Sequence, residues 1–555
     1  MSDKMRPVPF KELLLQALCE FKQNGSFFYV PVEKIDDRIR KVTLSGKEVE
    51  SPIGPASGPH TQLAQNIVSA YAAGARYFEL KTVQILDGDS LGLQKPCIYV
   101  KDEAYNTEWS TELTSYQALA EYIKAWYLLK LLIKEFHLGD INGFVFNMSV
   151  GYDLGGIQSE KIDYFIEGMK DAAATESFKE CEHTTLGNLD WFSAITAEYV
   201  KNIDSHISNT ITLSTMHGCP ANEIERIMMY LIEEKKLNTY LKCNPTLLGA
   251  DEVGKILNDM GYDYISFDTE VFKQDISFDA VVGLIKKLQP AGDKNQLEFG
   301  IKLTNTFPVK ITNQELQGEN MYMSGTALYP LTIGVAAKLS GALDKKVSIS
   351  YSGGADAGNI GAIYETGICP VTVSTLLLKT GGYKNLSKLN KALARHPVDQ
   401  PRAIQVDKIK KLAEEALFDQ SYFRTPDKFI NIQNTDYSPY CSTCRNCVDV
   451  CPNRANVLYE RNHKKYTIHQ DALCNECGNC SYSCILGHVP YKEKFTVFLT
   501  EADLFDSKNN GFYQDEQVLI IRWMGQIHKG NKKEMNRIAG DIMDLINYIN
   551  IPAVV

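Results

Sequence analysis

The chain has 555 residues, of which 44% are hydrophobic and 23% charged, and its formal net charge is −10. This length predicts two or more domains, and an acidic balance without a long Lys/Arg run argues against nucleic acid or an anionic membrane as the main partner. The first residues, MSDKMRPVPF, lack the apolar core of a signal peptide, and no apolar stretch is long enough for a transmembrane helix. We therefore expect a cytoplasmic protein.

In chain order, residues 1–50 form an N-terminal extension that opens with a helical pattern over Phe10–Phe21. Residues 51–400 then alternate short apolar strands, such as Arg76–Lys81 and Thr210–Ser214, with longer helical segments. This alternation predicts a parallel α/β architecture, and a (β/α)8 TIM barrel, which tolerates insertions, fits the length. We expect an insertion near residues 270–320, with a strand of its own at Phe299–Leu303.

The last part of the chain is rich in cysteine. After an expected helical linker at 401–440, eight of the 14 cysteines fall within a module at 441–488, and a C-terminal tail follows at 489–555. The two runs are Cys441-x-x-Cys444-x-x-Cys447-x-x-x-Cys451-Pro452 and Cys474-x-x-Cys477-x-x-Cys480-x-x-x-Cys484. This spacing is typical of bacterial two-cluster ferredoxins. The predicted fold is therefore an α/β TIM barrel followed by a small dicluster ferredoxin domain.

The same spacing assigns ligands. In two-cluster ferredoxins the first three cysteines of a run bind one cluster and the fourth binds the other. One 4Fe–4S cluster is thus assigned to Cys441, Cys444, Cys447 and Cys484, and the second to Cys474, Cys477, Cys480 and Cys451. The alternative is a pair of four-cysteine zinc sites, since zinc also uses C-x-x-C pairs. Zinc does not need a third cysteine at the same step, so the spacing favours iron–sulfur clusters.

Two late segments of the barrel region predict a phosphate site. Gly353 and Gly354 follow one strand, and Ser374 and Thr375 follow the next. Loops at the C-terminal ends of barrel strands often bind phosphate through N–H and hydroxyl groups. Lysines in apolar strands, here Lys81 and Lys242, are costly unless they meet an anion, although each alone could extend to solvent. Together these features predict a flavin, whose reduced ring is anionic.

Ordered segments of the chain resemble the FMN barrel of dihydropyrimidine dehydrogenase: SPIGPASGPH (51–60), FELKT (78–82), MSGTALYP (323–330), YSGGAD (351–356) and PVTVST (370–375). YNTEWSTEL (105–113), CVDVCPNRANV (447–457) and DALCNECGNC (471–480) are similar to large bacterial iron–sulfur flavoproteins of the selenate reductase-like family, often placed in heterocycle breakdown. The resemblance implies an FMN site formed by Ala56, Ser57, Lys81, Thr82, Lys242, Gly325, Gly353, Gly354, Ser374 and Thr375.

The resemblance also implies partners. Both relatives carry an FAD and NAD(P)H domain on the same chain, whereas this sequence has no GxGxxG followed by a helix and an acidic residue. A separate subunit similar to the small subunit of glutamate synthase is therefore expected to supply FAD and NAD(P)H. A hetero-oligomer, with a further redox subunit in it, is part of the same expectation.

Substrate residues are also implied by the resemblance. Three asparagines of the pyrimidine enzyme are matched by Asn106, Thr212 and Asp268, and a retained Thr269 follows the last of them. An ionised carboxylate only accepts hydrogen bonds, whereas an amide also donates. Asp268 therefore predicts that uracil and thymine are poor substrates.

The catalytic cysteine of that enzyme is matched here by Thr215. Cys219 follows four residues later and His217 lies between them. Each of the three could donate a proton to a ring carbon, and we place Cys219 slightly ahead of Thr215. A structural role is the alternative for each, since a lone buried cysteine usually packs.

Two functions follow from this sequence. In the first, the chain is an oxidoreductase subunit whose FMN reduces or oxidises a small nitrogen heterocycle, with electrons exchanged through the clusters with a partner NAD(P)H/FAD subunit. In the second, the barrel is catalytically silent, and the clusters link a flavoprotein to another redox enzyme such as a molybdenum hydroxylase. The replaced asparagines and the displaced cysteine favour the second function, and the retained lysines and phosphate loops favour the first.

Overall fold

The computed structural model describes the chain except for residues 1–3, 101–102, 108–109, 217, 344–346, 397–402, 426–443, 462–463, 516–517, 532–542, 544–545 and 547–555. Eight parallel strands form its central sheet, in the order β5-β16-β15-β12-β11-β10-β9-β6. Their bounds are β5 Ile53–Pro55, β6 Tyr77–Glu79, β9 Val145–Val150, β10 Thr210–Ser214, β11 Asn238–Cys243, β12 Phe299–Leu303, β15 Ser348–Tyr351 and β16 Val371–Val373. Consecutive strands in the chain are neighbours in space, as in a (β/α)8 barrel.

The barrel closes where β5 meets β6. The Arg76 N–H donates to the Ile53 carbonyl at 2.9 Å. A Cβ atom on Gly54 would lie 1.5 Å from the Tyr77 carbonyl oxygen, so only glycine permits this approach. The predicted TIM barrel is thus confirmed.

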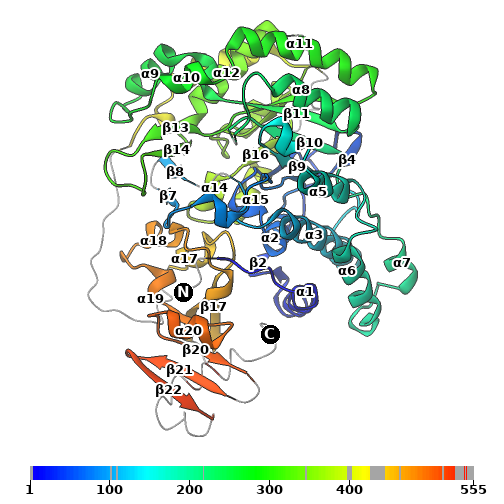
Figure 1. Ribbon diagram of the computed structural model, residues 1–555, viewed down its shortest axis with the longest axis vertical. Helices are drawn as coiled ribbons and strands as arrows, with labels where there is room; N and C mark the ends of the chain where they lie inside the picture. Colours follow the sequence, from blue (N-terminus) through cyan, green and yellow to red (C-terminus); the bar gives the residue numbers. More distant parts are fainter. Residues whose placement is uncertain are drawn as a thin grey trace.

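Helices follow the strands and cover the barrel on the outside (Figure 1). Each has a face that matches the helical period, for example Val253, Ile256 and Leu257 of α9, which are buried together. The longest helix begins with a capping box in which the Thr114 hydroxyl accepts from the Gln117 N–H and the Gln117 side chain accepts from the Thr114 N–H. The covering helices are α2 Ala64–Ala72, α3 Ser115–Phe136, α4 Leu154–Ile157, α5 Glu160–Lys170, α6 Glu176–Leu186, α7 Ala197–Lys201, α8 Ile224–Met229, α9 Ala250–Asp259, α10 Glu270–Gln274, α11 Phe278–Lys294, α12 Leu328–Ala342, α13 Ile360–Glu365, α14 Thr375–Leu378, α15 Lys384–Leu393 and α16 Val406–Ala416.

The insertion expected at 270–320 is placed differently. Phe299–Leu303 is the barrel strand β12, paired with both β11 and β15, because all five of its residues are buried. The segment that leaves the barrel is the hairpin of β13 Phe307–Lys310 and β14 Asn320–Gly325. It joins β8 Glu103–Asn106 and β7 Ile98–Val100 in a four-stranded antiparallel sheet beside the barrel.

The N-terminal extension and the expected linker belong to the barrel's surroundings. Helix α1 Phe10–Asn24 buries Phe10, Leu13 and Leu14 in the same apolar core as the barrel helices, and the short strands β1 Ser26–Phe27, β2 Val30–Pro31, β3 Val42–Leu44 and β4 Lys47–Val49 follow it. In the expected linker, α16 buries Ile409 in that core. It is therefore a covering helix, and the rest of the expected linker falls largely outside the described residues.

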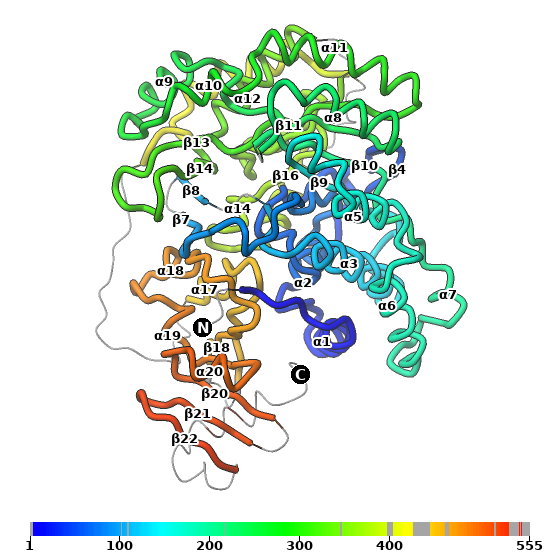
Figure 2. The backbone as a smooth tube through the Cα atoms, in the orientation of Figure 1, coloured from blue at the N-terminus to red at the C-terminus, as the bar shows by residue number. Residues whose placement is uncertain are grey.

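The C-terminal part forms a second body below the barrel (Figure 1, Figure 2). Six strands make one sheet in the order β17-β18-β19-β20-β21-β22, so the expected tail after residue 489 is a continuation of the cysteine-rich module. Its elements are α17 Asn446–Asp449, β17 Asn456–Arg461, β18 Lys464–Gln470, α18 Asn479–Tyr482, α19 Pro490–Glu493, β19 Phe495–Val497, α20 Glu501–Asp506, β20 Gly511–Gln514, β21 Leu519–Trp523 and β22 Gln526–Gly530. Ile468, Phe495 and Phe512 from three neighbouring strands fill its small core.

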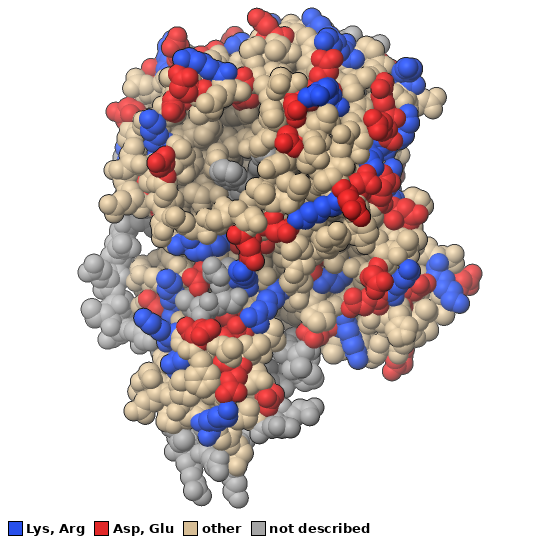
Figure 3. Space-filling view, in the orientation of Figure 1, with Lys and Arg blue, Asp and Glu red and all other residues tan. Residues whose placement is uncertain are grey.

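Acidic and basic side chains are interspersed over the face seen in Figure 3, without one large patch of either sign. Within the described ranges, no helix has both the length and the apolar character to cross a bilayer.

Candidate functional site

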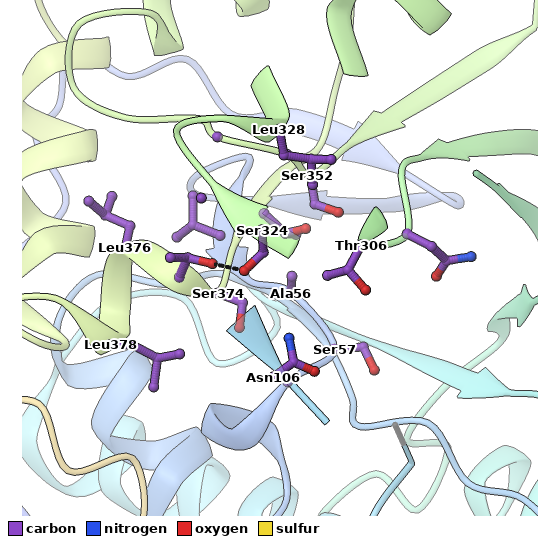
Figure 4. Close-up of a pocket in the computed structure, with 18 of the residues that line it drawn as sticks. Ala56, Ser57, Asn106, Thr306, Ser324, Leu328, Ser352, Ser374, Leu376 and Leu378 are labelled. Carbon is purple, nitrogen blue, oxygen red and sulfur yellow. Dashed lines mark hydrogen bonds between the residues drawn. The ribbon is translucent and has the colours of Figure 1, made fainter. Parts of the chain in front are cut away.

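A deep cavity opens at the C-terminal ends of the barrel strands, where barrel enzymes place their chemistry. The empty space in the cavity and its open mouth, solvent included, is about 1210 Å³. The sheet of β7, β8, β13 and β14 forms one wall, with Ile98, Asn106 and Tyr322 facing the space. All ten predicted FMN residues line this cavity: Ala56, Ser57, Lys81, Thr82, Lys242, Gly325, Gly353, Gly354, Ser374 and Thr375. Figure 4 shows how Ser57, Asn106 and Ser374 lie around the same space.

Buried charges lie beneath the cavity, inside the barrel. Lys242 of β11 and Lys302 of β12 are directly paired in strand register, and Glu79 of β6 lies between them. Its carboxylate is 3.4 Å from Lys242 Nζ and 3.0 Å from Lys302 Nζ. Two cations therefore share one anion, and Lys81, 3% exposed, lines the cavity together with Lys242.

This arrangement shifts the pKa values of the charged groups. Burial alone would raise the pKa of Glu79, but Lys242 and Lys302 outweigh it and lower the pKa to about 2. Burial lowers the pKa of Lys302 to about 8, although Glu79 opposes that change. Lys302 also donates to Thr372 Oγ1 at 2.6 Å and to Ser350 Oγ at 3.0 Å. The cavity lining thus carries the cations Lys81 and Lys242 as well as the carboxylate of Asp356.

Glycine shapes the wall that was predicted to hold phosphate. Gly353 has φ +147°, and a Cβ there would lie 2.3 Å from Thr332 Oγ1. Gly354 has φ +69°, and its Cβ would lie 2.7 Å from Tyr329 Cβ. Neither position accepts a side chain, so the loop keeps its N–H groups accessible to a ligand. Two hydroxyls next to it are fixed, because Thr375 Oγ1 donates to Ser324 Oγ at 2.8 Å (dashed in Figure 4).

Several functional candidates were missed in the sequence. Asn305 and Thr306 form an Asn–Thr pair just after β12 and line the cavity. The Asn305 amide donates to Asn244 Oδ1 at 2.6 Å, and its carbonyl accepts from Ser214 Oγ at 3.4 Å. The signal that could have found the pair was the position of Phe299–Leu303 as a barrel strand, since the residues after such a strand belong to the site. Glu79 lay within the FELKT segment but was not singled out.

Of the four predicted substrate residues, one lines the cavity and the other three do not. Asn106 lines it, and its amide donates to the Tyr322 carbonyl at 3.5 Å. Thr212 is buried inside the barrel and accepts from Asn147 Nδ2 at 2.8 Å, so it is part of the internal packing. Asp268 and Thr269 are exposed, and the Asp268 carboxylate accepts from the Glu270 N–H at 2.9 Å. Because Asp268 does not line the cavity, it gives no reason to expect uracil and thymine to be poor substrates.

Of the predicted proton donors, neither Thr215 nor Cys219 lines the cavity. Thr215 Oγ1 donates to the Lys242 carbonyl at 3.1 Å, while Met216 is the lining residue of this loop. Cys219 packs partly buried against the apolar core, and burial raises the pKa of its thiol to about 12. His217 lies outside the described residues. The structure thus supports proximity for Thr215 and leaves Cys219 in a packing role.

A second, smaller cavity lies in the C-terminal body. Its walls include all four cysteines assigned to the second cluster, Cys451, Cys474, Cys477 and Cys480, and its empty space is about 310 Å³. Of the first set, Cys444 is exposed, Cys447 and Cys484 are partly buried, and Cys441 lies outside the described residues.

The sulfur atoms of the second set receive backbone hydrogen bonds. The Ala455 N–H donates to Cys451 Sγ at 3.2 Å and the Glu476 N–H donates to Cys474 Sγ at 3.3 Å. Such bonds stabilise thiolates that hold a cluster. Without a cluster, burial raises the pKa values of Cys474 and Cys477 well above that of an ordinary thiol. In the described part of the chain, no three His, Cys, Asp or Glu side chains are arranged to hold a single metal ion.

The two cavities are separated by one layer of side chains. The Cys477 carbonyl accepts from the N–H groups of Cys97 and Ile98, at 3.1 and 2.9 Å. Cys477 packs with Ile98 and Leu378 in one apolar cluster, and both of these residues line the barrel cavity. Gly478 permits the approach, because it has φ +87° and its Cβ would lie 2.5 Å from Pro96 Cβ.

Comparison with known proteins places this chain among relatives. The family model described as "Oxidoreductase YgfK, N-terminal TIM-barrel domain" matches residues 28–424. YgfK from Escherichia coli strain K12 is 44% identical over 432 residues, which are 75% of this chain and 42% of YgfK, and the protein from E. coli O157:H7 gives the same values. The chain thus spans less than half the length of these relatives. A crystal structure of DHODH in complex with ferulenol from Eimeria tenella matches 70% of this chain and 92% of that chain, at 14% identity and a TM-score of 0.42.

Proposed function

This chain belongs to the family of the oxidoreductase YgfK N-terminal TIM-barrel domain, and from that premise we propose that it is an iron–sulfur flavoprotein subunit of an oxidoreductase complex. FMN would occupy the barrel cavity, and two 4Fe–4S clusters would be held by the eight cysteines of residues 441–484. When bound, FMN would exchange a hydride with a small nitrogen heterocycle and single electrons with the clusters. A partner subunit would supply FAD and NAD(P)H.

The observation that carries the proposal is the contact between the two cavities. Cys477, one of the four cysteines around the smaller cavity, accepts a hydrogen bond from the Ile98 N–H and shares one apolar cluster with Ile98 and Leu378 of the larger one. The backbone at Gly478 approaches Pro96 so closely that a Cβ atom on residue 478 would lie 2.5 Å from Pro96 Cβ. This close approach supports redox groups that lie near one another. The pairing of a thiol-lined cavity with a cation-lined cavity supports electron exchange between them.

The residues of the barrel cavity fit a flavin phosphate and an electron-poor ring. Gly353 and Gly354 leave room that a Cβ atom would fill. Lys81 and Lys242 favour negative charge on a ligand, and Glu79, which also pairs with Lys302, pairs with Lys242 from beneath. The chain itself therefore binds, orients and stabilises an anionic ligand.

The substrate class follows from the amides. Asn106 and Asn305 both line the cavity, on β8 and after β12. An amide donates and accepts, which suits the alternating N–H and C=O groups of a purine- or pyrimidine-related ring. Thr215 would be a candidate to pass a proton through Asn305, because its Oγ1 donates to the Lys242 carbonyl at 3.1 Å and accepts from Asn305 Nδ2 at 3.5 Å.

The test is reoxidation by a panel of heterocycles. The full chain, prepared without air and reduced with dithionite, is mixed with uracil, thymine and purine derivatives while the flavin spectrum is followed. We expect at least one compound to reoxidise the flavin, and the Asn305→Ala variant to lose that reaction at unchanged FMN content. Failure of every compound on FMN-loaded protein would overturn the heterocycle assignment.

A second function is favoured by one observation. Thr215 stands in the place expected for a catalytic cysteine, and Cys219 lies outside the cavity lining. A chain of this kind could serve only to pass electrons between a flavoprotein and another redox enzyme. FMN content separates the two functions: one FMN per chain supports catalysis in the barrel, and protein that holds clusters but no FMN supports the scaffold.

A further inference from the structure

Arg454 is a buried guanidinium in the cysteine-rich module, only 3% exposed. It lies three residues after Cys451, with a φ of 62° that an arginine rarely adopts. Nε donates to the Phe28 carbonyl at 3.0 Å, and one terminal nitrogen donates to the carbonyls of Val448 at 2.9 Å and Cys451 at 3.4 Å. These acceptors are all neutral backbone groups.

Among the described residues, no Asp or Glu oxygen is within ion-pair distance of Arg454, whose hydrogen bonds all go to carbonyls. Its guanidinium lies 5.7 Å from the centre of the Tyr383 ring. The charge of Arg454 acts on the carboxylate of Glu20, which is 7% exposed. Burial raises the pKa of Glu20, and Arg454 is among the groups that lower it. Lys95, beside the same module, is neutralised by Glu112 at 2.7 Å. A buried cation that forms no ion pair is costly.

A cubane held by four thiolates is an anion, and it would supply that missing counter-charge. The carbonyls that Arg454 holds belong to Cys451, assigned to the second cluster, and to Val448, which follows Cys447 of the first. The next residue in the chain, Ala455, donates its N–H to Cys451 Sγ. Arg454 is therefore fixed at the peptide that bears a cluster ligand.

We propose that Arg454 is the charge-compensating residue of the cluster held by Cys451, Cys474, Cys477 and Cys480, and that it raises the reduction potential of that cluster. Reduction adds one negative charge, which a nearby buried cation stabilises more than it stabilises the oxidised state. The inference rests on the proposed function, since it requires the clusters. Glu20 accepts from the Tyr29 N–H at 2.6 Å, one residue after the Phe28 carbonyl that Arg454 binds, so its carboxylate offsets part of the charge of Arg454 and is expected to lower the same potential.

The test is a potentiometric titration of the full, anaerobically prepared chain, followed by electron paramagnetic resonance. Arg454→Gln is expected to move one cluster to a more negative potential by at least a tenfold change in its reduction equilibrium, or about 59 mV for one electron. Arg445→Gln is the matched control, because the Arg445 side chain is 39% exposed and lies 3.6 Å from the Asp449 carboxylate. It is expected to change the equilibrium less than threefold.

Arg454 could instead serve only to clamp Phe28 to the module. Arg454→Lys separates the roles, because it keeps the charge and loses the fork of hydrogen bonds. The charge role predicts a potential near that of the native chain, together with a lower melting temperature. Equal shifts in the Lys and Gln variants would overturn the proposal.

Glu20→Gln provides a measurement that does not alter the cysteine loop. The neutral amide still accepts from the Tyr29 N–H, as the carboxylate does at 2.6 Å. At pH 8 this variant is expected to move the same cluster to a more positive potential, opposite to Arg454→Gln. If Arg454→Gln fails to fold, the change in cluster reduction potential caused by Glu20→Gln tests the proposal instead. An unchanged or more negative potential in Glu20→Gln would overturn the proposal. A native chain that contains no iron would instead contradict the proposed function.

Discussion

The barrel cavity and the cysteine-rich module both bury positive charge, but they compensate it differently. In the barrel, Lys242 and Lys302 share the Glu79 carboxylate, so one anion of the protein offsets part of the charge of two cations. In the module, Arg454 donates to carbonyl oxygens and lies over the Tyr383 ring, and burial raises the pKa of the Cys474 and Cys477 thiols well above the ordinary value. The barrel charges are thus partly balanced within the protein, whereas our proposal assigns the balance of Arg454 to a bound cluster.

The largest expected effect breaks the link between the two regions. Cys477→Ser removes one ligand of the second cluster, so the protein should keep about four of about eight irons and lose electron exchange with the barrel flavin while keeping its FMN. Iron analysis and stopped-flow reduction measure this. Cys97→Ser is the control, because Cys97 is a buried neighbour of Cys477 outside the cluster sets. Full iron content in Cys477→Ser would contradict the ligand assignment.

The second prediction concerns the preformed charges of the barrel. Lys302→Met leaves Glu79 with one cation and removes buried hydrogen bonds to Thr372 and Ser350. Breaking a buried ion pair from one side costs about 3–5 kcal/mol, which urea unfolding of the apo chain measures. Lys287→Met is the control, since its pair with Glu225 is exposed and is expected to contribute less than about 1 kcal/mol. Equal destabilisation by the two variants would show that the barrel charges are not coupled.

How much of this could be predicted from the sequence differs between the same two regions. The cysteine ligands follow one another at a fixed step, so their local spacing carries the prediction. The FMN residues were predicted from short motifs, and all ten predicted residues line one cavity. The Glu79–Lys302 pair was missed because it joins β6 to β12 across the barrel, which no local pattern encodes.

Two errors have the same physical origin. Assigning Phe299–Leu303 to an insertion hid Asn305 and Thr306, because the residues after a strand belong to the site only if that strand is in the barrel. The expected tail after residue 489 joins the module through parallel pairing of β18 with β19, a contact set by tertiary packing.

A third prediction tests the phosphate wall. Gly353→Ala places a Cβ atom 2.3 Å from Thr332 Oγ1 at φ +147°, so the loop would shift and FMN affinity would fall about tenfold or more. Fluorescence titration of apo-protein with FMN measures it. Gly283→Ala is the control, as a Cβ there would meet nothing within 4 Å in α11. Unchanged FMN affinity in Gly353→Ala would place the phosphate elsewhere.

The smallest effect is a pH dependence. The pKa of Lys302 is lowered by burial to about 8, below its ordinary value, so between about pH 8 and 10 the unfolded apo chain binds more protons at this group than the folded chain. Stability from this residue therefore rises with pH. The difference in free energy of unfolding between the native chain and Lys302→Met should widen by at most about 1.4 kcal/mol per pH unit in that range. A difference that narrows would mean that Lys302 stays charged.

The most direct measurement of the central claim counts iron and FMN in one sample of the full chain prepared without air. The account predicts about eight irons and one FMN per chain in the same protein. Zinc in place of iron, or protein that binds neither group, would contradict it.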